Sequence, residues 1–149
     1  MSHTYCSALF HCVFSTKNRT KSIAPELQKP LGAFMAGIAR KQGMNLLAAG
    51  GTDDHVHLLL SIPSSKPLAQ GLREIKSGSS RWMKETGGIS SFQWQEGYGA
   101  FSVGCSQVNT TLTYIARQHE HHRKHDFQAE FIAFLKKHRI DYDPKYVLS

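Results

Sequence analysis

Two histidines separated by one residue, His55 and His57, have the type and spacing best suited to chemistry in this sequence. In a β-strand, residues two apart point to the same face, so the segment 55–63 (HVHLLLSIP) would present both imidazoles side by side. Two neutral imidazoles at this spacing can bind one divalent metal ion. His11, on the outward face of an earlier predicted strand, could lie close to the pair. The same spacing also occurs on strand faces that are merely polar and partly exposed.

A tyrosine and a glutamine one helical turn apart form the second pattern. The helix predicted over 106–124 has an apolar stripe and, beside it, a polar stripe that contains Tyr114 and Gln118. A tyrosine on a polar stripe is not placed like a core residue, although an interfacial tyrosine on an amphipathic helix is the alternative. The apolar stripe consists of Val108, Leu112 and Ile115, and the polar stripe of Tyr114, Gln118, His121 and His125.

Together, the two patterns indicate attack on a phosphate. A tyrosine phenol has a pKa of about 10 in water and is a poor nucleophile while protonated. It can attack phosphorus if a nearby metal ion polarises the phosphate and stabilises the developing charge. A neutral ligand set of His55, His57 and Gln118 would leave the cation its full charge for that purpose.

The charge balance indicates a polyanionic partner. The chain has 149 residues with 18 Lys and Arg against 11 Asp and Glu, a formal net charge of +7 that does not count nine histidines. A pI near 9.5 is typical of nucleic-acid-binding proteins and less often of proteins at anionic membrane surfaces. Length and a 40% apolar content predict a single domain over 1–149 with its own core.

Cysteine usage and hydropathy indicate the compartment. Cys6, Cys12 and Cys105 are odd in number and lack CxxC spacing, which argues against a disulfide framework and against a cysteine zinc site. No apolar stretch approaches a membrane span, and the N-terminus does not resemble a secretory signal. We therefore expect a cytoplasmic protein without membrane contact.

The order of predicted elements is β-α-β-β-α-β followed by further helices. This is an α+β, ferredoxin-like plan, in which four antiparallel strands carry two helices on one face. The C-terminal helices, one of which carries Tyr114, would be free to cover the other face. The predicted strands are 5–16, 45–50, 55–63 and 92–104; the predicted helices run from Pro25 to Gly43, over 68–84, over 106–124, and from an N-cap at Asp126.

At this point the chain resembles the HUH-type single-tyrosine transposases of bacterial insertion sequences that move as single-stranded DNA. The resemblance is carried by DDHVHLLLSIP, WQEGYGAFSV and YIARQHEHH, in this order. It extends from FHCVFSTKNR to FLKKHRIDYDPKYV, which is nearly the whole chain.

The resemblance implies a mechanism. Tyr114 matches the nucleophile, which attacks a DNA phosphate and leaves a 5′-phosphotyrosine link and a free 3′-hydroxyl; strand transfer reverses this step. His55 and His57 match the HUH pair, and Gln118 matches the residue that completes a site for Mg²⁺ or Mn²⁺. The resemblance also implies a homodimer that binds hairpins at the transposon ends. Its active sites can be composite, with the tyrosine helix of one subunit serving the histidines of the other.

Basic and aromatic side chains are the candidates for DNA contact. Exposed lysines and arginines bind phosphates, and aromatic rings stack on unpaired bases, although at least two of the three rings in 92–104 are expected to pack in the core. The basic candidates are Lys17, Arg19, Lys21, Arg73, Lys76, Arg81 and Lys84, and the aromatic ones are Trp94, Tyr98 and Phe101.

Two alternative functions share these features. A REP-associated, domesticated tyrosine transposase would use the same chemistry on chromosomal hairpins. A non-catalytic protein on the same fold would bind hairpin DNA or RNA through its basic loops and need no metal. The alignment of Tyr114 and Gln118 with a complete histidine pair favours the enzyme.

Overall fold

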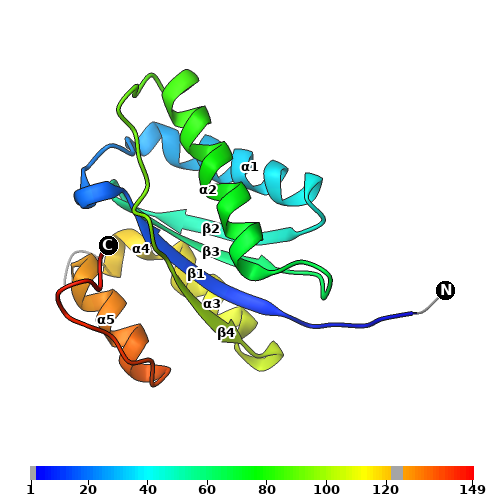
Figure 1. The fold of residues 1–149 in the computed structure, drawn as a ribbon. Helices are drawn as coiled ribbons and strands as arrows, with labels where there is room; N and C mark the ends of the chain where they lie inside the picture. The colour runs from blue at the N-terminus through cyan, green and yellow to red at the C-terminus, as the bar shows by residue number, and fades with distance from the viewer. Residues whose placement is uncertain (1–2, 122–125) are drawn as a thin grey trace.

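The computed structural model describes residues 3–121 and 126–149 and has the predicted α+β architecture (Figure 1). Four strands form one sheet in the order β2-β3-β1-β4, and each neighbouring pair is antiparallel. The first and third strands are therefore central, as the ferredoxin-like plan requires. The strands are β1 (Leu9–Ser15), β2 (Asn45–Gly51), β3 (His55–Ser61) and β4 (Gly99–Val103).

Helices cover both faces of the sheet. Figure 1 shows α1 and α2 on one face and the three C-terminal helices on the other. This division places the predicted tyrosine helix opposite the two helices of the ferredoxin-like unit. The helices are α1 (Pro25–Lys41), α2 (Leu68–Glu85), α3 (Val108–Ala116), α4 (Gln118–His121) and α5 (Phe127–Lys137), with short 3₁₀ turns η1 (Lys17–Arg19) and η2 (Cys105–Gln107).

Strand β3 is buried on both faces, but the two faces differ in chemistry. Val56, Leu58 and Leu60 point into the main hydrophobic core beneath α1 and α2. The alternate positions carry His55 and His57, which are fully buried on the opposite face. Because side chains alternate along a strand, the hydrophobic core lies on one face of β3 and the polar cluster lies on the other, with only the backbone of the strand between them.

The helix predicted over 106–124 is interrupted at Arg117, whose backbone (φ −107°, ψ 28°) is not helical. The Tyr114 carbonyl accepts hydrogen bonds from the Arg117 amide and from the Gln118 side chain. These bonds replace the regular helical pattern and end α3 early. Helix α4 then begins at Gln118, and the predicted residues 122–124 and His125 lie outside the described part of the chain.

The strand predicted over 92–104 is regular only in β4, from Gly99 onward. Before β4, Trp94 makes an isolated bridge to Thr16 and enters the core. The Lys76 ammonium donates hydrogen bonds of 2.7–3.0 Å to the carbonyl oxygens of residues 95–97, which hold this segment as a loop rather than a regular strand. The first strand is likewise shorter than predicted and starts at Leu9.

Helix α5 closes the second face of the sheet. Asp126 caps it by accepting a hydrogen bond from the Ala129 amide, as the sequence predicts. Its apolar side chains pack on Val13 and Phe101 and form a second hydrophobic cluster. This cluster fixes α5 against β1 and β4, beside the two histidines of β3. Its buried members from α5 are Phe127, Phe131 and Leu135.

Candidate active site

His57 lies at the centre of a buried polar cluster. Its Nδ1 is 2.7 Å from Nε2 of His11, and its Nε2 is 2.9 Å from Oε1 of Glu130. Burial, and next the neighbouring His57, lower the pKa of His11 to about 3. His11 is therefore neutral at physiological pH and can share one proton with His57, which leaves Nε2 of His57 facing the carboxylate. The predicted approach of His11 to the pair is confirmed.

His55 is held by partners on both ring nitrogens. Its Nδ1 lies 2.8 Å from Oδ1 of Asp54 and 3.0 Å from Oγ1 of Thr52. Its Nε2 lies 3.3 Å from Oε1 of Gln118 and 3.7 Å from Oε1 of Glu130. A carboxylate on the rear nitrogen of a histidine fixes the ring orientation and raises its basicity as a metal ligand. Nε2 of His55 is thus directed toward the same point as Nε2 of His57.

Glu130, on α5, is the residue of this site that the sequence motifs do not include. It is a buried carboxylate, 8% exposed, and one ligand atom each from Glu130, His55 and His57 lie within 4.8 Å of one another. A buried carboxylate is costly unless it is paired or binds a cation. The sequence held a weak signal: Glu130 occupies a position between Phe127 and Phe131 on the face that packs against the sheet.

Tyr114 approaches the same carboxylate from α3. Its hydroxyl donates a short hydrogen bond to Oε2 of Glu130. Its ring stands edge-on to His57, with centroids 5.7 Å apart, and to Phe134, at 5.6 Å. Burial and then the hydrogen bond and charge of Glu130 raise the pKa of Tyr114, so the phenol keeps its proton at neutral pH. One carboxylate therefore contacts both the candidate nucleophile and a candidate metal ligand.

Two glycines determine how closely the helices that carry these groups approach the sheet. Gly50, His57, Val13 and Gly99 form one row across the four strands, so both ends of the row lack side chains. A Cβ atom on Gly99 would overlap the ring of Phe131 in α5. The absence of that atom lets α5 sit close to the sheet.

The other edge glycine accommodates the tyrosine helix. A Cβ atom on Gly50 would overlap the carbonyl oxygen of Ile115, the residue after Tyr114. Ile115 itself is buried, and α3 packs on β2 and β3. Because the obstacle is backbone, α3 cannot adapt by rotating a side chain. The absence of a side chain at Gly50 therefore allows α3 to place Tyr114 beside His57.

Replacing Gly50 by alanine is expected to push α3 outward and to lower the free energy of unfolding by about 1–3 kcal/mol, the usual cost of overpacking. The amides of α3 should then exchange with deuterium faster, while those of α1 keep their rates. Gly37→Ala is the matched control, because a Cβ at Gly37 meets nothing within 4 Å and alanine favours a helix by about 0.5–1 kcal/mol. Unfolding in urea and hydrogen exchange measure both. Equal effects of the two variants would contradict the proposal that α3 can approach β2 only because residue 50 is a glycine.

The cluster has the composition of a divalent metal site. Imidazole and carboxylate groups converge with ligand atoms close enough to share one ion, and Gln118 Oε1 adjoins them. This is a mixed nitrogen and oxygen set that can hold one divalent ion together with water or substrate oxygens. The predicted residues His55, His57 and Gln118 are therefore brought together, and Glu130 joins them.

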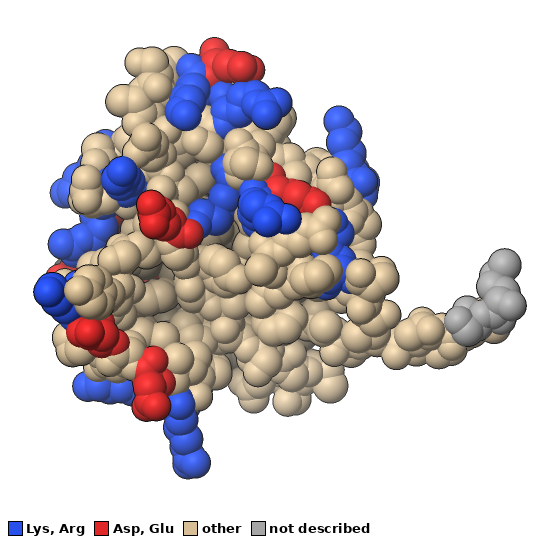
Figure 2. Space-filling view, viewed as in Figure 1, with Lys and Arg blue, Asp and Glu red and all other residues tan. Residues whose placement is uncertain are grey.

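The predicted DNA-contacting residues fall into separate places. Figure 2 shows lysine and arginine side chains over α2 and over the loop that follows β1, with acidic side chains among them. Lys17, Arg73 and Lys76 border one hollow of about 580 Å³ together with Tyr98. The Lys76 ammonium is already committed to the three loop carbonyls. Arg19 and Lys21 border another hollow near His55, and Arg81 and Lys84 lie exposed on the last turns of α2.

The three candidate stacking rings also separate. Trp94 and Phe101 are buried, at 8% and 2% exposure, and pack in the two hydrophobic clusters. Tyr98 is 36% exposed beside Lys76. As expected, two of the three rings belong to the core, which leaves Tyr98 as the one that can reach a ligand.

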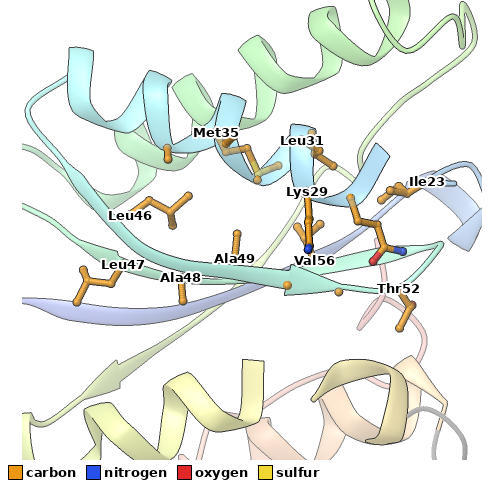
Figure 3. A pocket seen from close by; sticks show the side chains of 16 residues that line it. Ile23, Lys29, Leu31, Met35, Leu46, Leu47, Ala48, Ala49, Thr52 and Val56 are labelled. Atoms are coloured by element: carbon orange, nitrogen blue, oxygen red, sulfur yellow. The ribbon is translucent and has the colours of Figure 1, made fainter. Parts of the chain in front are cut away.

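An aliphatic hollow lies on the other side of the sheet. It has a volume of about 380 Å³ between α1 and β2 (Figure 3). Leu31 and Met35 from α1 face Leu46 and Ala49 from β2 across it. The histidine and tyrosine cluster lies on the opposite face of the sheet. This hollow is therefore separate from the candidate active site.

The chain belongs to the family of IS200-like transposases: the family model described as "Transposase IS200 like" matches residues 4–118. Curated relatives agree with this assignment. The chain is 26% identical over 110 residues to the transposases for insertion sequence element IS200 of Salmonella typhimurium and Salmonella typhi. Each match covers 70% of this chain and 72% of the relative.

Solved structures share the fold. A crystal structure from Deinococcus radiodurans R1, described as a transposase, superposes with a TM-score of 0.62 at 22% identity and covers 79% of this chain and 96% of that one. A REP-associated tyrosine transposase bound to a REP hairpin gives a TM-score of 0.58 at 15% identity, covering 78% and 70%. Both confirm the α+β plan. Among the described helices of this chain, none is long and apolar enough to span a membrane.

Proposed function

We propose that this transposase cleaves and rejoins single-stranded DNA through a covalent bond between Tyr114 and a 5′-phosphate. The observation that carries the proposal is the contact chain from the Tyr114 hydroxyl through Glu130 to His57. A non-catalytic nucleic-acid-binding protein has no need for a buried carboxylate that joins a phenol to a histidine. The contact chain therefore favours the enzyme over that alternative.

The side chains of this protein account for the proton and the new bond. As the phenol oxygen of Tyr114 attacks phosphorus, Oε2 of Glu130, its hydrogen-bond partner, accepts the phenol proton. The bond from phosphorus to the 3′ oxygen breaks, and that oxygen takes a proton from water and leaves as a free 3′-hydroxyl. Rejoining runs in reverse: a 3′-hydroxyl gives its proton to water as it attacks the phosphotyrosine, and Tyr114 recovers its proton from Glu130.

His55, His57 and Glu130 would hold a divalent cation, Mg²⁺ or Mn²⁺, with Gln118 at the same site. The bound ion would polarise the phosphate and stabilise its developing charge. Asp54 and His11, on the rear nitrogens of the two histidines, keep both Nε2 atoms directed at the ligand position.

We propose hairpin-forming single-stranded DNA as the partner. The fold relative that is bound to a REP hairpin supports this class of ligand, and the charge of +7 favours it. In this chain Tyr114 lies beside the histidines of its own chain, so one subunit contains every group of the proposed reaction. We propose a homodimer that brings two DNA ends together, with composite active sites where the tyrosine helix of one subunit serves the histidines of the other instead of its own.

The test uses single strands that cover both flanks of the gene, labelled at either the 5′ or the 3′ end. With Mn²⁺, we expect the 3′ label to become attached to the protein and the 5′ label to appear on a shortened strand that a polymerase can extend. EDTA should abolish both products, and added Mn²⁺ should restore them. Attachment of the 5′ label, or full activity in EDTA, would contradict the proposed reaction.

A further inference from the structure

A second polar cleft is lined by Asp54, the residue before His55. It has a volume of about 730 Å³ and is bounded by the loop after β1, the turn between β2 and β3, α4 and the start of α5. Its size is that of pockets that take small molecules or single nucleotides rather than a duplex. Its polar lining combines the cations and neutral groups of Asn18, Arg19, Lys21, Gln28 and His119 with three carboxylates, Asp53, Asp54 and Asp126.

The loop that supplies Arg19 is strained. Asn18 and Arg19 both have positive φ, 58° and 54°, a backbone conformation that is unfavourable for residues other than glycine. The buried Thr16 stabilises the loop: its hydroxyl donates to the Thr20 carbonyl over 2.7 Å, and its carbonyl accepts from the Arg19 amide. The surroundings thus hold the exposed Arg19 in a conformation that it would not adopt alone.

The same loop is hydrogen-bonded to the turn before β3. The Thr16 amide donates to the Asp54 carbonyl over 2.8 Å, and the Ile23 amide donates to the Asp53 carbonyl over 2.9 Å. The carboxylate of Asp54 in turn lies against Nδ1 of His55. The backbone of Arg19 is therefore connected to His55 through two residues, Thr16 and Asp54.

The lining suits an unpaired nucleotide. Arg19 and Lys21 can bind phosphate oxygens, while the amide of Gln28 and the carboxylate of Asp53 offer groups that pair with base edges. A carboxylate repels phosphates but accepts hydrogen bonds from amino groups of bases. Such edges are accessible only in single strands whose bases are unstacked.

We propose that this cleft binds the nucleotides of the single strand next to the cleaved bond, with Arg19 as the principal contact. The inference rests on the proposed function, since it places the strand relative to the Tyr114 and His55 site. Because the loop is connected to His55 by hydrogen bonds, a nucleotide bound in the cleft would align the adjacent phosphate with the Tyr114 and His55 site. Arg19 would thus contribute to the choice of cleavage site.

The experiment is a double-mutant cycle between Arg19→Gln and single methylphosphonate substitutions along the strand, each of which removes the charge of one phosphate. Binding of each labelled strand is measured by fluorescence anisotropy with Mn²⁺, and adduct formation is measured in parallel. We expect methylphosphonate substitution at one or two positions beside the cleaved bond to weaken binding by wild-type protein. Arg19→Gln should reduce that penalty by about fivefold or more, which is within the usual coupling of contacting groups.

Arg139→Gln is the matched control, because Arg139 is also an exposed arginine with positive φ (55°), at the end of α5. It should show no coupling to any position. If Arg19→Gln couples to no position, or no more than Arg139→Gln does, the cleft does not bind the strand. If wild-type protein forms no adduct yet Arg19 couples to positions in the bound strand, the cleft assignment stands and the proposed reaction fails.

Discussion

Replacement of Tyr114 by phenylalanine is expected to abolish the covalent protein–DNA adduct, because it removes the only oxygen that attacks phosphorus in the proposed reaction. Loss of a covalent nucleophile leaves binding and electrostatics alone, so strand cleavage should fall by at least about 10⁴-fold. The ring remains and keeps its edge contacts with His57 and Phe134. The fold should therefore survive with a loss of about 1 kcal/mol from the missing hydrogen bond.

Denaturing gels of protein incubated with labelled strand measure this loss directly. Tyr142→Phe is the matched control, since Tyr142 packs against the second hydrophobic cluster and its hydroxyl has no part in the reaction. It should form the adduct at the wild-type rate. An adduct that persists at normal yield in Tyr114→Phe would mean that another side chain is the nucleophile.

Replacement of His57 by alanine is expected to lower the affinity for Mn²⁺ by at least about 100-fold and to abolish cleavage. Loss of a group that merely supports a metal ligand typically costs 10- to 100-fold, and His57 is itself a proposed ligand. It also contacts both His11 and Glu130, so its removal disturbs the centre of the cluster. Excess Mn²⁺ should restore only a small part of the activity.

Titration calorimetry with Mn²⁺ measures the affinity, and thermal melting establishes that the variant is folded. His138→Ala serves as the control, because His138 is a partly buried histidine whose Nδ1 contacts the Phe134 carbonyl outside the proposed ligand set. Its Mn²⁺ affinity should match that of the wild type. Unchanged affinity in folded His57→Ala would rule out the proposed metal site.

The sequence predicted the parts of the fold that depend on local periodicity. In β3, alternation alone separates Val56 and Leu58 from His55 and His57, and the structure has the predicted division. Helix α1 begins at Pro25 and is followed by Gly43, whose φ of 78° suits glycine. These signals act over a few residues, so no tertiary contact is needed to interpret them.

The prediction failed where side-chain hydrogen bonds to the backbone override periodicity. Lys76 binds three carbonyls of the 95–97 segment and prevents the strand that the residue pattern there indicates. Gln118 bonds to the Tyr114 carbonyl and helps to end a helix that was expected to continue. In both cases a side-chain donor bonds to a backbone carbonyl in place of a backbone amide. The residue pattern along the chain does not predict this replacement.

The sequence predicted the site residues that belong to motifs, but it did not predict the carboxylate that joins them. His55, His57, Tyr114 and Gln118 fall within residues 4–118, which the family model matches. Glu130 lies beyond that segment, and only the packing of α5 on β1 brings its carboxylate to His57. A carboxylate within an apolar helix face was the available signal, but its partner could not be named without the sheet register.

The central claim is that Tyr114 carries the DNA, and mass spectrometry of the wild-type protein tests it most directly. The protein is incubated with its single-stranded end and Mn²⁺, trimmed with nuclease, digested with protease and fragmented. The account predicts one peptide that is heavier by a nucleotide 5′-phosphate, with the added mass on Tyr114. A nucleotide attached to any other residue, or cleaved DNA without a modified peptide, would contradict it.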